Sequence, residues 1–260
     1  LLIRIGPTSH VLHVTTHHSV NDGGSPRIFE RELPALYQAR RFGVPADFPS
    51  LTVLYRDYAI WQRDLLESAA LDHELGYWKD VLADAPLLQL PTDYPRPPRK
   101  SFVGAVHTFT VPAGLVDDLR TAAARESVSF FVILLTGVFV LMARRSGQHD
   151  VVIGTPTTGR GRPELEGLIG YFNSTVALRV DLSGSPQTSD LLRRVQAVVL
   201  GALEHQEIPF DRVVTALSGD RDVSRSPLFD VCHVHQELPA LQSASGVSEE
   251  LFDQSGPSAL

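Results

Sequence analysis

The densest group of polar side chains that could do chemistry lies near the start of the chain, where residues 17–23 read HHSVNDG. Imidazole titrates near neutral pH, so His17 or His18 can accept a proton from a reacting group and return it. Asp22 lies four positions after His18, where a carboxylate can fix the geometry, and Gly23 lets the backbone turn sharply. The run predicts a general-base site, with a purely structural histidine pair as the open alternative.

A metal site is a second alternative, because His10, His13, His17 and His18 lie close together in the sequence. Successive side chains of a strand point to opposite faces, so His17 and His18 would diverge, as would His10 and His13. The run also lacks Cys or Glu at the spacing of metal ligands. We therefore expect no metal site.

The segment around this site has a resemblance to a known family. Residues 17–25, HHSVNDGGS, resemble the HHxxxDGxS active-site motif of condensation domains in nonribosomal peptide synthetases. An HxxxD pattern alone is weak, since many acyltransferases contain one, but further runs match in the same order along nearly the whole chain. They are 55–62 (YRDYAIWQ), 77–78 (YW), 90–93 (LPTD), 95–97 (PRP), 153–160 (IGTPTTGR), 168–172 (LIGYF), 205–206 (HQ), 209–210 (PF) and 221–229 (RDVSRSPLF).

The resemblance implies an α/β fold of the chloramphenicol-acetyltransferase-like type, with two lobes. Residues 1–98 would be the C-terminal part of the first lobe, which contains the histidine loop, and residues 99–260 most of the second lobe. The first lobe is expected to be incomplete, because the earliest family motifs have no match. Both ends of the chain are expected to be cuts in a longer polypeptide.

The resemblance also implies roles for the residues of the histidine loop. His18 would be the catalytic residue, at a tunnel between the lobes with one carrier protein docking at each end. His17 and Asp22 would hold the loop, and Gly23 would let a backbone amide approach the reacting thioester. The family arginine that pairs with the loop aspartate belongs to the unmatched early motifs, so Asp22 is expected to lack its partner.

Four residues are implied to line the substrate tunnel: Tyr171, Phe172, Ser174 and Thr175. Where the family reads FVNT, this chain reads FNST, so Ser174 stands at the position of the family asparagine. The replacement is expected to alter loop contacts or the fit of the donor.

The implied reaction is amide-bond formation, in which the amine of one carrier-bound aminoacyl group attacks the thioester of an upstream acyl group. His18 would orient the amine and manage its proton. The domain itself is expected to bind no cofactor. Its substrates would be held on the 4'-phosphopantetheine of upstream and downstream peptidyl carrier proteins, in an assembly line that also contains an adenylation domain.

Two other functions stay open: a free-standing acyltransferase that uses coenzyme A, and a catalytically silent docking module of a synthetase. Within the superfamily, epimerization domains have a tryptophan-arginine pair that is missing after Ser25. Heterocyclization domains have aspartate in place of the histidines, which His17 and His18 exclude.

Three further features have ordinary structural explanations. Residues 154–161, GTPTTGRG, have the spacing of a phosphate-binding P-loop, but Arg160 replaces the required lysine and Gly161 the required hydroxyl, so we expect a glycine-rich turn after a strand. His205 is expected to cap or pack near a helix end. Cys232 lies in an apolar strand-like run, and with no GxSxG run in the chain we expect no covalent nucleophile.

The composition fits a globular protein with a buried core, since 43% of the 260 residues are hydrophobic and 20% are charged. A net charge of −7 would repel nucleic acid, which we exclude as a partner. The single cysteine fits a reducing cytoplasm. The longest apolar stretch, 128–143, is shorter than the ~20 residues that cross a bilayer, so we expect a buried helix and no membrane contact.

Periodicity predicts alternating strands and helices, which also favours an α/β layered fold. The expected strands are residues 1–5 and 10–16, as a hairpin, and 104–111, 150–153 and 175–181. The expected helices are 55–67, 71–82, 113–125 and 128–145, together with one that Ser25 caps and one that Thr188 or Ser189 caps. The proline-rich segment 86–99 is expected to be an extended connection between lobes.

Overall fold

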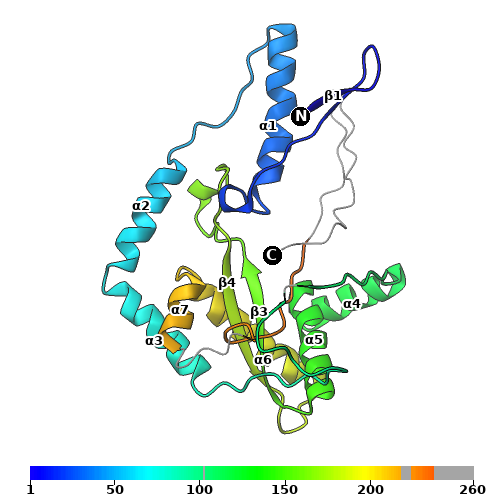
Figure 1. The fold of residues 1–260 in the computed structure, drawn as a ribbon, viewed down its shortest axis with the longest axis vertical. Coiled ribbons are helices and arrows are strands. Elements are labelled where there is room, and N and C mark those ends of the chain that lie inside the picture. The colour runs from blue at the N-terminus through cyan, green and yellow to red at the C-terminus, as the bar shows by residue number, and fades with distance from the viewer. Residues whose placement is uncertain (102, 218–223, 237–260) are drawn as a thin grey trace. The chain divides into compact units, whose positions relative to one another are not determined.

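The computed structural model describes residues 1–101, 103–217 and 224–236 (Figure 1). The chain forms two compact units. The first contains residues 1–64 and 158–173, and the second contains residues 65–157 and those from 174 onward. The lobe boundary near residue 98 stays a prediction.

The first unit begins with a short antiparallel hairpin. Strand β1 (Leu2–Arg4) pairs with β2 (His10–Leu12), with Leu2 opposite Leu12. The predicted hairpin is confirmed, but its second strand ends at Leu12, which is opposite Leu2, and not at residue 16. The opposite-face argument against a metal site was therefore wrong for the histidines that follow Leu12.

The remaining elements of the first unit are two long helices and two short 3-10 turns. They are η1 (His18–Val20), α1 (Ser25–Phe42), α2 (Tyr55–Leu66), whose last two residues are assigned to the second unit, and η2 (Pro163–Leu165). Helix α1 ends at Gly43, whose φ of 70° is a left-handed conformation that glycine adopts without steric cost. The predicted helix over 55–67 is confirmed as α2.

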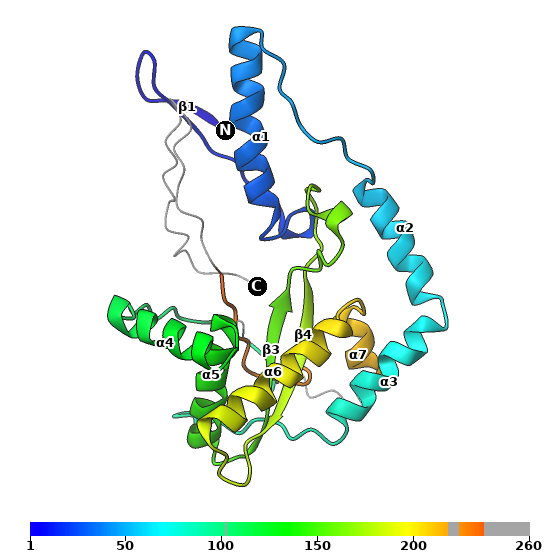
Figure 2. The ribbon, with the colours of Figure 1, turned by 180° about the vertical axis from the view of Figure 1, so that it is seen from behind.

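The second unit is built on a two-stranded ribbon of β3 (Asp150–Thr157) and β4 (Ser174–Asp181). The strands are antiparallel, with Asp150 opposite Asp181 and Thr157 opposite Ser174. The described residues of the same unit form five helices: α3 (Ala70–Leu82), α4 (Ala113–Arg125), α5 (Phe130–Ser146), α6 (Thr188–Glu204) and α7 (Phe210–Leu217). Figures 1 and 2 show the ribbon from two sides, and α5 contacts β3 while α6 and α7 contact β4.

The core of the second unit lies between this ribbon and its helices. Leu135 and Phe139 of α5, Ile153 of β3 and Val195 of α6 are all fully buried. The Ser129 hydroxyl caps α5 by accepting from the Val132 amide at 3.2 Å. The apolar stretch of the sequence is thus a buried core helix, as predicted.

No single helix among the described residues is long and apolar enough to cross a membrane. Helices α4 and α5 together meet the same criteria of length and composition, but the pair is bent by 105° at its break.

Several local predictions were wrong. Residues 104–111 form no strand, and Val106 and Phe109 are 71% and 78% exposed, because no described strand pairs with the segment. Helix α6 has Gln187 at its N-cap position and no side-chain cap, so neither Thr188 nor Ser189 caps it. Residues 154–157 continue strand β3, and the expected turn comes only at Gly159, where φ is 61°.

Candidate active site

His17 and His18 are held in a tight turn rather than at the end of a strand. His17 is the N-cap of η1, where its Nδ1 accepts from the Ser19 amide at 3.1 Å. His18 Nδ1 lies 2.6 Å from the carbonyl oxygen of Asn21. A carbonyl can only accept, so His18 Nδ1 carries the proton and the Nε2 of the neutral ring has a free lone pair. The two histidines therefore have opposite tautomers.

The ring of His18 is exposed and has one aromatic neighbour within the unit. The ring centroids of His18 and Tyr171 are 5.5 Å apart with the planes at 80°, an edge-to-face arrangement. Tyr171 is itself 41% exposed. Since Nδ1 is engaged with the backbone, Nε2 is the atom of His18 that can meet a substrate.

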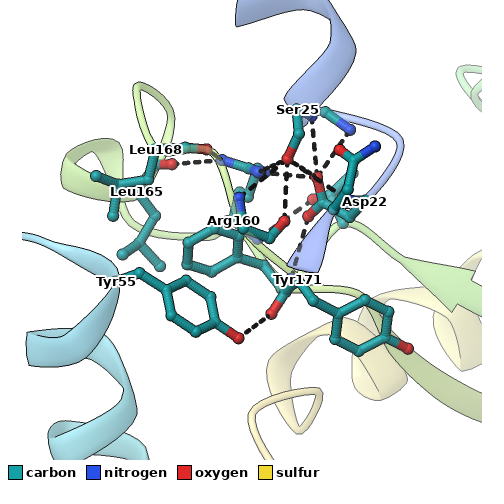
Figure 3. A network of polar contacts seen from close by, with 12 residues as sticks. Asp22, Ser25, Tyr55, Arg160, Leu165, Leu168 and Tyr171 are labelled. Atoms are coloured by element: carbon teal, nitrogen blue, oxygen red, sulfur yellow. Dashed lines mark hydrogen bonds and ion pairs between the residues drawn. The ribbon is translucent and has the colours of Figure 1, made fainter. Parts of the chain in front are cut away.

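Asp22 forms the centre of a buried polar network, drawn in Figure 3. Its Oδ1 accepts from the backbone amides of Gly24 at 3.1 Å and Ser25 at 3.0 Å, and its Oδ2 accepts from the Phe172 amide at 3.1 Å. The residue is only 2% exposed. Asp22 thus satisfies the free amides at the start of α1, a role that the sequence predicts for Ser25.

Asp22 has a charged partner, which corrects the expectation that it would lack one. Arg160 Nη2 lies 2.8 Å from Asp22 Oδ1, and the two side chains are 8% and 0% exposed. The same guanidinium donates through Nη1 to the carbonyls of Leu165 at 2.6 Å and Leu168 at 2.8 Å. Arg160 therefore ties the histidine loop to the backbone of residues 165–168 (Figure 3).

Sequence reasoning missed Arg160 as the partner of Asp22. Arg160 belongs to the GR pair of the run 153–160, for which the sequence predicts only a turn. It is distant from Asp22 along the chain, so no local spacing could join the two. The signal that could have found it is the need of a loop carboxylate for a cation, given that the early family arginine has no match.

The environment of Asp22 favours its ionised form. Burial acts to raise the pKa of Asp22, but the hydrogen bonds from Arg160 and Ser25, the charge of Arg160 and the Phe172 amide together hold that pKa below its usual value of 3.8. Asp22 is therefore a carboxylate at neutral pH, and it serves as a fixed acceptor rather than as an acid.

Ser25 links the start of α1 to a second backbone segment. Its hydroxyl accepts from the Gly170 amide at 3.1 Å. The hydroxyl oxygen also lies 2.9 Å from Asp22 Oδ1 and 3.0 Å from the Gly170 carbonyl, to either of which it donates. With 1% exposure, Ser25 is a packed connector between the two segments.

A small apolar cluster packs beside the Asp22 network and contains residues of the segment 165–172. It consists of Leu165, Leu168 and Phe172, with Val53 and Tyr58 packed against them. The Tyr55 hydroxyl donates to the Tyr171 carbonyl at 2.8 Å, and burial together with the charge of Asp22 raises the pKa of Tyr55 above 10.0. The Tyr55 hydroxyl therefore keeps its proton at neutral pH and holds the backbone carbonyl of Tyr171 through this hydrogen bond.

The four residues expected to line a tunnel occupy different positions. Tyr171 is partly exposed beside His18, whereas Phe172 is 2% exposed and lies under the guanidinium of Arg160, at 4.3 Å. Ser174 and Thr175 are the first residues of β4 in the second unit. Their role in a tunnel stays a prediction, as do the roles of His18, His17, Asp22 and the exposed Gly23.

Two further residues that the sequence singled out, His205 and Cys232, have contacts that explain them structurally. His205 is the C-cap residue of α6, stacks on Tyr77 at 3.9 Å and contacts Glu74 at 2.8 Å, so the prediction that it caps or packs near a helix end is confirmed. Cys232 forms an isolated bridge with Gly154. Within the described ranges, no group of three or more His, Cys, Asp or Glu could hold a metal ion. Residues 221–223 of one matched run lie outside the described residues.

Comparison with known proteins assigns the family. The family model described as Condensation domain matches residues 1–258. Malpibaldin synthetase of Mortierella alpina is 41% identical over 236 residues, which are 90% of this chain but 4% of that protein. The chain thus spans a small part of a much longer relative.

Two solved structures are similar throughout most of the chain. The X-domain from teicoplanin biosynthesis gives a TM-score of 0.76 at 30% identity, over 89% of this chain and 53% of that one. A four-domain nonribosomal peptide synthetase, bound to AMP and glycine, gives a TM-score of 0.74 at 28% identity, over 86% of this chain and 17% of that one. The predicted α/β fold of the chloramphenicol-acetyltransferase-like type is confirmed.

An acyltransferase-type fold with a histidine and a fixed carboxylate in one loop defines the class of this protein. The chain belongs to the family of condensation domains of nonribosomal peptide synthetases.

Proposed function

We propose that this chain is the part of a condensation domain that joins a carrier-bound acyl thioester to the amine of a carrier-bound aminoacyl group. The observation that supports it most is the hydrogen bond between His18 Nδ1 and the Asn21 carbonyl, at 2.6 Å. That bond fixes the tautomer in which Nε2 can accept a proton or hydrogen-bond an amine. His18 is the proposed catalytic residue.

The proposed chemistry is direct aminolysis of the thioester. The amine nitrogen attacks the thioester carbon, the C–N bond forms and the C–S bond breaks, and one amine proton ends on the departing thiolate. A free α-amine has a pKa of about 7.7, so much of it is already a nucleophile at neutral pH. His18 Nε2 therefore orients the amine and relays its proton, while the Asp22 network holds the turn that presents the imidazole.

The proposed partners follow from the family. The substrates are carried on the 4'-phosphopantetheine of upstream and downstream peptidyl carrier proteins, beside an adenylation domain of the same assembly line. The domain itself binds no cofactor and works in the cytoplasm. Support comes from the relatives, which are long synthetases, and from one similar structure with four domains.

The test is a substitution of His18 in the full-length protein that contains this chain. We expect His18→Ala to lower dipeptide formation by roughly ten- to ten-thousand-fold, the range for a lost acid, base or orienting group. Loaded donor and acceptor carrier proteins are the substrates, product is measured by mass spectrometry, and carrier binding should barely change.

A matched control is His10→Ala, which removes an exposed imidazole from β2 and should condense at the unaltered rate. Condensation by His18→Ala at that same rate would refute the assignment. Acyl transfer from free coenzyme A thioesters would instead favour the free-standing acyltransferase. A wild-type protein that is folded and binds carrier proteins, but forms no dipeptide, would favour the silent docking module.

A further inference from the structure

Two buried hydroxyl groups face each other at the end of the β3–β4 ribbon. Thr157 and Ser174 are directly opposite in the register, and Thr157 is 9% exposed. The Thr157 Oγ1 and Ser174 Oγ atoms are buried, and neither has a hydrogen-bond partner within the described part of the chain. Opposite threonine and serine side chains commonly bond to each other across strands, so the open pair is unusual. We call Thr157 and Ser174 the hydroxyl pair.

A third unpartnered polar atom lies on the same face of the ribbon. The His233 amide donates to the Gly154 carbonyl, which places the His233 side chain on the face of Thr155 rather than that of Gly154. The Thr155 hydroxyl donates to the His233 carbonyl at 2.9 Å. The His233 Nε2 is buried without a partner among the described residues. Burial lowers the pKa of His233, so its ring is neutral.

The face that these groups share contains no charged side chain within β3 and β4. Alternation along the strands places only aliphatic and hydroxyl side chains on it. They are Val151, Ile153, Thr155, Thr157, Ser174, Val176, Leu178 and Val180. The ion pair of Arg179 and Asp150 lies on the other face. A charged group brought here would lose its hydration without gaining a counter-charge from either strand.

An unpartnered buried hydroxyl is costly in a folded protein and calls for an explanation, and a functional role is one that accounts for two such groups side by side. From this arrangement we propose that the hydroxyl pair is a specificity subsite for a neutral hydrogen-bonding group, of the carboxamide type, on the side chain of a condensing aminoacyl substrate. A carboxamide offers one acceptor and two donors. One hydroxyl can therefore donate to its oxygen while the other accepts from its nitrogen.

The inference rests on the proposed condensation activity, and it names the kind of substrate side chain that the hydroxyl pair favours. By the family resemblance, Ser174 stands at the position of an asparagine, and its side chain is shorter than that of asparagine.

The first experiment measures substrate choice in the full-length protein. Asparaginyl, leucyl and aspartyl groups have nearly the same shape and differ in hydrogen bonding and charge. Each is loaded on the donor carrier with a glycyl acceptor, and then on the acceptor carrier with a constant acetyl donor. We expect condensation to favour asparaginyl over both others in one of the two arms, which identifies the substrate concerned. No preference in either arm would overturn the proposal.

The second experiment compares two threonine variants of the same strand. Thr157→Val removes a hydroxyl without a partner, so the melting temperature should stay level or rise, while the preference for asparaginyl over leucyl should fall roughly five- to tenfold. Thr155→Val removes a hydroxyl that has a partner, so the melting temperature should fall. Ser174→Ala should reduce the preference as Thr157→Val does.

The outcomes separate this proposal from the proposed activity. A lower melting temperature for Thr157→Val would show that its hydroxyl is already satisfied, by a bound water for example, and would overturn the subsite. An unaltered asparaginyl preference in both Thr157→Val and Ser174→Ala would do the same. Absence of condensation with every substrate in the wild type would instead refute the proposed activity.

Discussion

Asp22 is the residue on which most contacts of the candidate site converge. It accepts from the amides of Gly24, Ser25 and Phe172 and pairs with Arg160. Both of its oxygens accept hydrogen bonds from these groups, and the side chain is 0% exposed, so the carboxylate is not open to a substrate in this structure. These contacts are what a positioning residue for the turn that contains His18 requires, and that role is the one we propose for Asp22.

We expect Asp22→Asn to destabilise the protein at least as much as it slows condensation. The variant leaves Arg160 buried without a counter-charge, which costs about 3–5 kcal/mol when one partner of a buried pair is removed. The measurement is the free energy of unfolding from denaturant titration. A variant with wild-type stability but no activity would make Asp22 a direct participant in the chemistry.

The stability of the Asp22→Asn variant relative to the wild type should also depend on pH. The folded-state pKa of Asp22 is below the usual 3.8, so the stabilisation by its carboxylate is fully present above that value and is lost as pH falls through the folded pKa. The difference in stability between wild type and Asp22→Asn should therefore be constant from neutral pH to about pH 5 and shrink below pH 4.

At this scale the sequence predicted part of the site. The histidines, the carboxylate and the glycine of the loop could be read from their types and order. Arg160 could not, because its contact with Asp22 depends on how residues 158–173 fold back within the unit, which no local pattern expresses. The tautomer of His18 was equally hidden, since it depends on the carbonyl of Asn21 and on the turn that brings that carbonyl to Nδ1.

At the scale of elements, the turn that follows β3 determines where Arg160 and Phe172 lie. Gly159 has a φ of 61°, and a Cβ built on it would lie 1.7 Å from the Phe172 carbonyl oxygen. Only glycine fits both the left-handed backbone and this close approach. At the neighbouring Gly161, a Cβ would have no atom within 4 Å, so this glycine serves as a matched comparison.

We expect Gly159→Ala to displace the backbone of Phe172, whose amide donates to Asp22, and so to disturb the Asp22 network. The expected result is a melting temperature lower by several degrees and slower condensation. Gly161→Ala should leave both nearly unaltered. Equal melting temperatures for the two variants would show that the turn is not tied to the network.

The helices could be predicted from apolar spacing in the local sequence, whereas a strand forms only where a second strand pairs with it. The helices over 55–66, 113–125 and 130–146 follow from apolar spacing that is written in the local sequence. Residues 104–111 alternate as a strand does, but alternation gives a strand only where a neighbour supplies the hydrogen bonds. Helix α7 was missed because it is a short helix of a few turns beside a proline.

At the scale of the molecule, the first unit is discontinuous in sequence. Residues 158–173 leave the second unit after Thr157 and return to it at Ser174, yet they belong with residues 1–64. Among the described residues, the hydrogen bonds of the Arg160 side chain are with Asp22, Ser25, Leu165 and Leu168, which all belong to the first unit. Loss of this side chain should therefore affect one unit more than the other.

We expect Arg160→Ala to raise amide hydrogen exchange at residues 24–25 and 165–172, while the amides of β3, β4 and α6 keep their protection. Exchange measured by mass spectrometry of peptide fragments can resolve these segments. The control is Arg31→Ala, which removes an exposed ion pair with Glu32 in the first unit and should change neither. An equal rise across both units would mean that they unfold together.

The β3–β4 ribbon has a consequence for how the segment 158–173 can vary. Its strands act as a stem that already joins the two ends of the segment, which removes a loop-closure cost of roughly 2.5 kcal/mol from the folding of that loop. Side chains of a strand alternate between faces, so the insertion of one residue into β3 or β4 would exchange the face of every residue beyond it. The segment 158–173 can therefore change in length more freely than the two strands of the stem. Within β3 or β4, we expect insertions and deletions to be tolerated only in pairs of residues.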